Sequence, residues 1–338
     1  MSIIKQIATE CGVSTATVGH ILGNKRNMHS EETCSRVLLH AEKLGYRPNS
    51  SAMAIGSGRF NCATLLLSTY TTKSNLQDQK LLGIHEVLDS HDYHLNIARM
   101  TDERMAFNVS LPKFLRQWMT DGILVNYTSE ISERVLEGIR GDRAPAVWIN
   151  SKQEWDCVRP DDFLAGYEAT IHLLKLGHSR ILFTEFGGPH YSVDDRYQGY
   201  ASAMESAGLT PRLERHALDV QEWIGIAHRI LEAPDRPTAV VAYAEFPGKA
   251  IAHVAERLGL RVPEDLSLVM FADLPVEDLT TGRRFTSWLV PEYEVGETAA
   301  HMLLKKIAMP EKSFAPITVP FVMSDDVSCS RLAGAPAR

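Results

Sequence analysis

The chain has 338 residues, of which 44% are hydrophobic and 23% are charged. This length allows two or three domains that each bury a core, and the hydrophobic fraction argues against a wholly disordered chain. No apolar run approaches the roughly 18 residues of a membrane-spanning helix. The first residues, MSIIKQIATECG, contain no apolar segment of the kind found in signal peptides. We therefore expect a cytoplasmic protein.

The cysteines are an odd number, are widely scattered and form no CxxC pair; they are Cys11, Cys34, Cys62, Cys157 and Cys329. This pattern argues against a disulfide framework and against a zinc site. We expect the thiols to be small buried groups. We predict no metal site and no cofactor.

The net charge of −7 argues against a nucleic-acid partner until its distribution is considered. Residues 1–60 hold seven Lys and Arg against four Asp and Glu, a net charge of +3, so the remainder carries −10. A small basic head on an acidic body is the first indication of function.

The head contains three predicted helices. Residues 3–11 have apolar positions at helical spacing and end at Gly12, and Ser14 can cap a second helix that extends to Leu22. Only a short turn separates these two helices, which is the spacing of a helix-turn-helix. Ser30 can cap a third helix that ends at Gly45.

Residues 48–60 predict a short helix followed by a Gly-rich stretch. A helix of fewer than about 12 residues is marginal by itself in water. The serines and glycines of this segment are equally typical of a flexible linker, so both interpretations stay open.

From residue 61 onward, predicted strands and helices alternate, which favours a parallel α/β architecture. Strands are expected at 63–68, 93–100, 121–126, 180–186, 238–243 and 267–271, and helices at 81–91, 111–120, 167–178, 196–209, 222–233 and 246–260. Two doubly wound units of similar size predict a ligand cleft between them, where the carboxyl ends of the strands present their loops.

Enzymatic motifs are missing from the sequence. It contains no GxxxxGK[ST], GxSxG or HExxH motif and no GxGxxG after a strand. The histidines are dispersed, and we interpret His178 as a structural residue at a helix end. We therefore predict that the chain is not an enzyme.

Three motifs of the head occur together: VSTATV at 13–18, SEET at 30–33 and LGYRPN at 44–49. In order and spacing they resemble the DNA-binding head of the lactose/galactose repressor (LacI/GalR) family. The resemblance implies that 14–22 is the recognition helix in the major groove and that 48–60 is a hinge helix whose wedge residue enters the minor groove. The DNA-contacting residues that it implies are Ser14, Thr15, Ala16, Thr17, His20, Lys25, Met53 and Ile55, with Ile55 as the wedge and Thr17 touching only phosphate or solvent.

The resemblance continues through GYEATIHLLKLGHSRI at 166–181, RYQGY at 196–200 and the stretch 236–275. It implies a core like that of type I periplasmic binding proteins. The domains it implies are 1–47 for the helix-turn-helix, 48–60 for the hinge, 61–157 plus about 286–320 for the N-terminal core subdomain, and 158–285 plus about 321–338 for the C-terminal core subdomain.

The effector-binding residues that we predict are Tyr70, Thr128, Asp161, Arg196, Trp223, Glu245 and Asp273. Arg196 stands where the family contacts its effector, and its planar fork suits a carboxylate, a phosphate or a pair of hydroxyls. Three of these residues have a plainer structural alternative. Arg196 pairs with Asp194 or Asp195, Trp223 packs in the core, and Asp161 caps a helix.

These observations predict a homodimeric, sequence-specific transcriptional repressor that binds palindromic operator DNA and is modulated by a small molecule related to carbohydrates. Effector binding is expected to change the angle between the core subdomains and so either to separate the paired hinges, as an inducer does, or to tighten the hinge pair, as a corepressor does. One alternative is a DNA-binding regulator whose core only dimerises or docks a protein partner. Another is an α/β ligand-binding protein that does not bind DNA.

Overall fold

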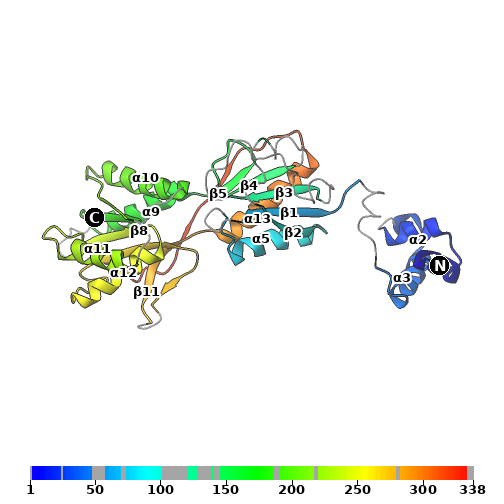
Figure 1. The fold of residues 1–338 in the computed structure, drawn as a ribbon, viewed down its shortest axis with the longest axis horizontal. Helices are drawn as coiled ribbons and strands as arrows, with labels where there is room; N and C mark the ends of the chain where they lie inside the picture. The colour runs from blue at the N-terminus through cyan, green and yellow to red at the C-terminus, as the bar shows by residue number, and fades with distance from the viewer. Residues whose placement is uncertain are drawn as a thin grey trace. The chain divides into compact units, whose positions relative to one another are not determined.

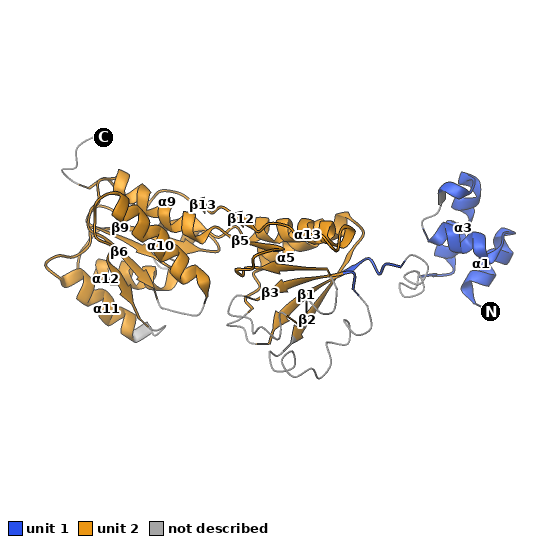
Figure 2. Ribbon diagram, turned by 90° about the horizontal axis from the view of Figure 1, so that it is seen from above, with its two compact units in different colours: residues 1–62, 117–121 blue, residues 63–116, 122–338 orange. Residues whose placement is uncertain are grey.

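We analysed a computed structural model of the chain, which describes residues 2–23, 26–47, 58–69, 74–100, 120–127, 137, 139, 145–185, 190–216, 220–278 and 282–332. It divides into two compact units (Figure 2). Unit 1 comprises Met1–Cys62 with Gln117–Asp121, and unit 2 comprises Ala63–Arg116 with Gly122–Arg338.

Unit 1 contains a bundle of short helices, α1 (Ile3–Cys11), α2 (Thr15–Leu22), the 3₁₀ helix η1 (Arg26–Met28) and α3 (Glu31–Lys43) (Figure 1). Gly12 ends α1 with a φ of 63°, a left-handed conformation that glycine adopts at little cost. The Ser14 hydroxyl accepts a hydrogen bond from the Thr17 amide at 3.0 Å, and Ser30 does the same for Thr33 at 3.3 Å. Both predicted caps are therefore present.

The first sheet of unit 2 has the order β12-β5-β4-β3-β1-β2. Its strands are β1 (Cys62–Ser68), β2 (His94–Met100), β3 (Gly122–Asn126), β4 (Ala146–Ile149), β5 (Cys157–Pro160) and β12 (Ile317–Val319). The pairs from β1 through β3, β4 and β5 to β12 are parallel. Helices α5 (Asp78–Ser90) and α13 (Glu292–Ala308) bury their apolar side chains against this sheet.

The second sheet has the order β10-β11-β9-β8-β6-β7, and β13 also pairs with β11. Its strands are β6 (Ile181–Glu185), β7 (Leu213–Arg215), β8 (Ala239–Ala242), β9 (Ser267–Ala272), β10 (Val276–Glu277), β11 (Arg284–Leu289) and β13 (Val322–Met323). On one face lie α9 (Asp162–Lys175) and α10 (Tyr191–Ser206), and on the other lie α11 (Val220–Glu232) and α12 (Glu245–Arg257). Buried helices on both faces explain why the strands are almost wholly apolar.

The chain passes between the two sheets three times. These crossovers lie between β5 and α9, between β11 and α13, and between β12 and β13. The subdomain boundaries expected at 157 and 286 therefore need correction. Strand pairing keeps β5 in the first sheet as far as Pro160 and places residues 286–289, as part of β11, in the second.

Two helix pairs approach so closely that glycine is required at the crossing. A Cβ atom on Gly166 of α9 would overlap the carbonyl oxygen of Arg196 on α10, and one on Gly199 of α10 would overlap the carbonyl oxygen of Phe163. Gly83 of α5 and Gly296 of α13 meet each other's helices in the same way. Both crossings lie within the first three turns of their helices.

Among the described residues, no helix is long and apolar enough to cross a membrane. All five cysteines are free thiols, and four of them are buried. The predicted helix at 111–120 lies outside the described residues.

Candidate functional site

One candidate site is the exposed face of α2 in unit 1. Val18 and Ile21 are fully buried against α1 and α3, so the opposite side of the helix faces solvent. That side presents Thr15, Ala16 and His20, which are exposed. Their short or planar side chains leave the helix narrow enough to approach the edges of base pairs in a major groove.

The structure describes only some of the remaining predicted DNA-contacting residues. Ser14 and Thr17 share a hydrogen bond of 2.9 Å between their hydroxyls at the start of α2, so both side chains serve the cap. The ring of His20 stacks on that of His29, with 5.8 Å between the centroids. Lys25, Met53 and Ile55 lie outside the described residues.

A second candidate site is a cavity of about 680 Å³ within unit 2. The first subdomain contributes Asn75, Gln77, Lys80, Asn150, Pro160 and Glu292; the second contributes Asp162, His190, Ser192, Arg196, Tyr243, Ala244, Glu245, Phe246, Phe271, Ala272, Asp273 and Val290. Pro160, Asp162, Val290 and Glu292 belong to or adjoin two of the crossovers. A ligand here would touch segments that connect the two subdomains.

Arg196, a predicted effector contact, lines this cavity, and it forms an ion pair with Asp162 and not with Asp194 or Asp195, the partners of the plainer alternative. Its Nε donates to Asp162 Oδ1 at 2.8 Å, and its Nη1 donates to the carbonyl oxygen of Tyr243 at 2.9 Å. The guanidinium also lies 4.7 to 5.2 Å from the centroids of the Tyr243, Phe271 and Phe321 rings. Burial raises the pKa of Asp162, while Arg196 acts in the opposite direction.

Lys80 is the other basic residue of the cavity, and it is only 1% exposed. Its Nζ lies 2.7 Å from Oε2 of Glu292, at the start of α13. Burial raises the pKa of Glu292, and the positive charge of Lys80 opposes this rise. The close crossing of α5 and α13 thus holds one buried ion pair, as that of α9 and α10 holds the other.

His190 adds a polar but uncharged group. Its Nδ1 contacts the Ser192 hydroxyl at 2.5 Å, and that hydroxyl contacts the Tyr243 hydroxyl at 2.7 Å. Burial, together with the charge of Arg196, lowers the pKa of His190 to about 4. The imidazole is therefore neutral at physiological pH.

The predicted acidic residues Glu245 and Asp273 both line the cavity. Glu245 pairs with Lys249 at 2.8 Å on α12, and Asp273 accepts a hydrogen bond from Gln77 across the cavity. Loss of hydration at this position raises the pKa of Asp273. The two subdomains also meet through Lys152 and Asp195 at 2.6 Å, and through Tyr191 and Asn150 at 3.1 Å.

Two other predicted effector contacts, Asp161 and Trp223, do not line this cavity. Asp161 caps α9 by accepting from the Leu164 amide at 3.1 Å, and its neighbour Asp162 faces the cavity instead. Trp223 is fully buried in the core under α11 and α12, so its ring cannot stack on a ligand there; Tyr243, Phe246 and Phe271 are the aromatic residues of the lining. Tyr70 and Thr128 lie outside the described residues.

The residues that sequence reasoning missed are Lys80, Glu292, His190 and Tyr243. Lys80 and Glu292 are distant in sequence, and each sits in an amphipathic helix that gives no sign of a buried charge. For the cavity as a whole, the signal in the sequence was the pair of adjacent acids Asp161 and Asp162 at the end of a strand. This pair indicated the position of the cavity, but Asp162 lines it and the predicted Asp161 does not.

Comparisons with known proteins agree with the division of the chain into a helical head and an α/β core. Residues 3–49 match the family model described as bacterial regulatory proteins, lacI family, and residues 170–323 match that of a periplasmic binding protein-like domain. The HTH-type transcriptional repressor PurR of Yersinia enterocolitica is 28% identical over 322 residues, covering 91% of each chain. Catabolite control protein A of Priestia megaterium is 25% identical over 311 residues, covering 89% of this chain and 91% of that one.

Solved structures are similar over nearly the whole length. The lac repressor dimer bound to operator and the anti-inducer ONPF has a TM-score of 0.76 at 18% identity, covering 97% of this chain and 98% of that one. The complex of the transcriptional regulator CelR with cellobiose has a TM-score of 0.63 at 21% identity, covering 96% and 99%. A regulator from Enterococcus faecium with bound ribose has a TM-score of 0.62 at 22% identity, covering 80% and 99%.

Proposed function

Because the chain belongs to the LacI family of bacterial regulatory proteins, we propose that it represses transcription by placing α2 in the major groove of an operator, under control of a small molecule bound in the cavity of unit 2. It is a transcriptional regulator and not an enzyme. The observation that carries the first part is the α2 surface, where Thr15, Ala16 and His20 are exposed while the apolar side of the helix is buried.

The proposal includes a homodimer on a palindromic operator. A helix of eight residues offers only a few base contacts, so one head supplies little specificity. A two-fold dimer doubles the contacts and matches two half-sites related by the same symmetry.

The effector that we propose is a neutral polar molecule related to carbohydrates. Arg196 and Lys80, the basic residues of the described lining, are each neutralised by a buried carboxylate, and the other charged groups of the lining are the acids Glu245 and Asp273. A phosphate or carboxylate would face this acidic surplus, whereas hydroxyls can donate to it. The aromatic rings of the lining suit the apolar face of a sugar.

Control of DNA binding follows from the crossovers. A ligand that contacts Pro160, Asp162, Val290 and Glu292 binds one relative orientation of the subdomains better than another. It can shift the equilibrium between them only by that difference in affinity. The hinge segments that follow the heads are then brought together or separated, which alters operator affinity.

A selection from randomised duplex DNA with the full-length chain tests the first part. We expect a palindromic site, bound with a salt-sensitive affinity. Replacement of His20 by Ala should relax the preference at one base position per half-site, at a cost of about 1 to 3 kcal/mol, and Ser35→Ala on the exposed side of α3 serves as control. Recovery of no preferred sequence would overturn the DNA-binding role.

A thermal-shift panel of neutral sugars, sugar acids and sugar phosphates tests the second part. A specific ligand at 100 times its dissociation constant adds about 2.7 kcal/mol to stability. We expect responses only among the neutral compounds, and Asp273→Asn should weaken them. A uniformly flat panel would instead favour a core that dimerises or docks a protein.

A further inference from the structure

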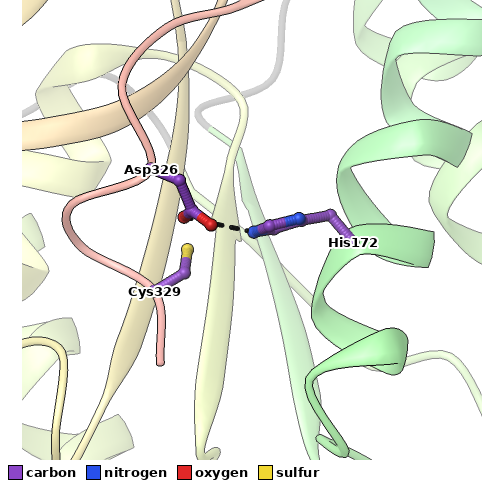
Figure 3. A group of neighbouring side chains, drawn as sticks. All are labelled: His172, Asp326 and Cys329. Carbon is purple, nitrogen blue, oxygen red and sulfur yellow. Dashed lines mark hydrogen bonds and ion pairs between the residues drawn. The ribbon is translucent and has the colours of Figure 1, made fainter. Parts of the chain in front are cut away.

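A cluster of three side chains with metal-ligating atoms lies outside the cavity, on the α9 side of the second sheet. Figure 3 shows His172, from the last turn of α9, directed toward Asp326 and Cys329 of the C-terminal segment. His172 Nε2 lies 3.2 Å from Asp326 Oδ1, and one ligand atom from each of the three residues lies within 4.8 Å of the others. His172 is more than 150 positions from Asp326 and Cys329 in the chain, so no sequence motif indicates the cluster.

From this geometry we propose that His172, Asp326 and Cys329 form a binding site for a thiophilic divalent cation of the Zn²⁺ class. A tetrahedral zinc site with bonds of about 2.0 to 2.3 Å separates its ligand atoms by roughly 3.3 to 3.7 Å. The imidazole and the carboxylate, 3.2 Å apart, are already close to that range. All three ligand atoms lie within 4.8 Å of one another, so binding a cation requires them to approach by no more than about 1 Å.

The backbone that carries two of the ligands is held firmly before any cation arrives. Thr286 on β11 accepts hydrogen bonds from the amides of Val327 and Ser328 at 3.0 Å, and its hydroxyl donates to Asp326 Oδ1 at 3.3 Å. The ring of His172 packs near that of Trp288, with 5.7 Å between the centroids. Outer contacts of this kind orient metal ligands and support their affinity.

The donor set decides which cation fits. An imidazole, a carboxylate and a thiolate suit zinc and other borderline-soft ions, whereas Mg²⁺ and Ca²⁺ prefer oxygen alone. Neutral imidazole with two anionic ligands balances the double positive charge of the cation. The partial exposure of His172 and Asp326 leaves a fourth position for water.

Binding has a definite proton balance. The Cys329 thiol donates to the carbonyl oxygen of Leu268, with 3.7 Å between the sulfur and the oxygen. Formation of the metal–sulfur bond therefore releases the thiol proton to solvent. The cation would join the C-terminal segment to α9, whose other end carries Asp162 in the cavity.

The test is a titration of the reduced, full-length protein with Co²⁺, a spectroscopic substitute for Zn²⁺. We expect a thiolate-to-cobalt charge-transfer absorption that saturates at one equivalent and disappears when one equivalent of Zn²⁺ is added. Cys329→Ser and His172→Gln should each weaken binding at least about 100-fold, beyond the 10- to 100-fold loss typical of outer-contact changes.

Matched controls separate this site from incidental binding. His228→Gln removes another histidine that faces a carboxylate, Glu232 at 3.7 Å, and Cys62→Ser removes another thiol; both variants should keep the absorption. The His172 side chain is 20% exposed and lies in the last turn of α9, so His172→Gln should fold even if Cys329→Ser does not. Absence of the absorption at one equivalent, or its survival in His172→Gln, would overturn the proposal.

Discussion

The Arg196 side chain could bind an anion, but its hydrogen-bond donors are already used by other groups of the protein. Its Nε and Nη1 donors are used by Asp162 and by the Tyr243 carbonyl, and aromatic rings surround its guanidinium. The pair is buried, with side-chain exposures of 10% and 1%. Breaking such a pair is costly because the remaining charge stays out of water.

Replacing Arg196 by Met should therefore destabilise the core by about 3 to 5 kcal/mol, since Asp162 loses its buried partner. The double variant Arg196→Met with Asp162→Leu removes both charges and should recover much of that loss. Urea unfolding of the wild type and the two variants measures the difference. Equal losses in the single and double variants would show that the charge of Asp162 is not the cause.

His190 makes the stability depend on pH in a known direction. Its pKa falls from an ordinary 6.5 to about 4 on folding, so between these values the unfolded chain binds the proton more readily. The stabilisation is complete above about pH 6.5 and is lost as the pH falls toward 4. At about 1.4 kcal/mol per pKa unit, the ceiling is roughly 3 kcal/mol.

His190→Gln should flatten this part of the stability curve. Urea unfolding of the wild type and the variant at several pH values from 4 to 7.5 gives the two slopes, and the difference at pH 7.5 supplies the baseline. Identical slopes would mean that His190 is not held neutral by its surroundings.

Sequence reasoning located single residues best where local structure decides their role. Ser14 and Ser30 were predicted as caps because a cap depends on the next three residues, and both predictions are confirmed. Arg196 was predicted as an effector contact, and the plainer alternative was an ion pair with its neighbour Asp194 or Asp195. The true partner, Asp162, comes from another helix, and only tertiary packing brings the two together.

At the scale of elements, the α9–α10 crossing determines where the Asp162–Arg196 pair lies in the cavity. Gly166 and Gly199 let the two backbones approach until Asp162 and Arg196 can pair. The contact is backbone against backbone, so an added methyl group cannot be accommodated by a side-chain rotation. The helices would have to move apart, and the ion pair would move with them.

Gly199→Ala should thus destabilise the protein by about 1 to 3 kcal/mol, the usual cost of overpacking, despite the higher helix propensity of alanine. Gly225→Ala on α11 is the matched control, because a Cβ atom there meets nothing within 4 Å. It should be neutral or stabilising. Thermal unfolding of both variants tests this, and a neutral Gly199→Ala would contradict the close crossing.

Most of the strongly patterned elements were predicted, but the 17-residue helix α13 and the six-residue strand β11 were not, and neither were the short strands. Strands β1, β3, β6, β8 and β9 appear as apolar runs, and the helices between them have clear periodicity. Strands β4, β5, β12 and β13 have two to four residues, too few for a pattern. Three of these, β5, β12 and β13, bound crossovers, and the missed strand β11 bounds another, which explains why the subdomain limits shifted by a few residues.

At the scale of the whole core, polar contacts across the cavity join the subdomains. Lys152 and Asp195 form one such ion pair, with side-chain exposures of 50% and 15%. Partly exposed pairs of this kind contribute about 0.2 to 1 kcal/mol. That amount is enough to shift a balance between two orientations several-fold without fixing either of them.

A double-mutant cycle with Lys152→Met and Asp195→Asn should give a coupling energy of about 0.2 to 1 kcal/mol in urea unfolding. The coupling should shrink at high salt because the lysine is half exposed. Additive effects of the two changes would show that the subdomains do not meet at this contact in solution.

The three crossovers also constrain how the protein is made on the ribosome. The edge strand of the first sheet, β12, comes from residues 317–319, and the last strand paired in the second sheet, β13, follows at 322–323. Neither subdomain can finish its sheet until almost the whole chain has been synthesised. The head, in contrast, has its own apolar core within the first 47 residues and can fold early. A nascent chain would therefore carry a finished DNA reader well before it has a completed sensor.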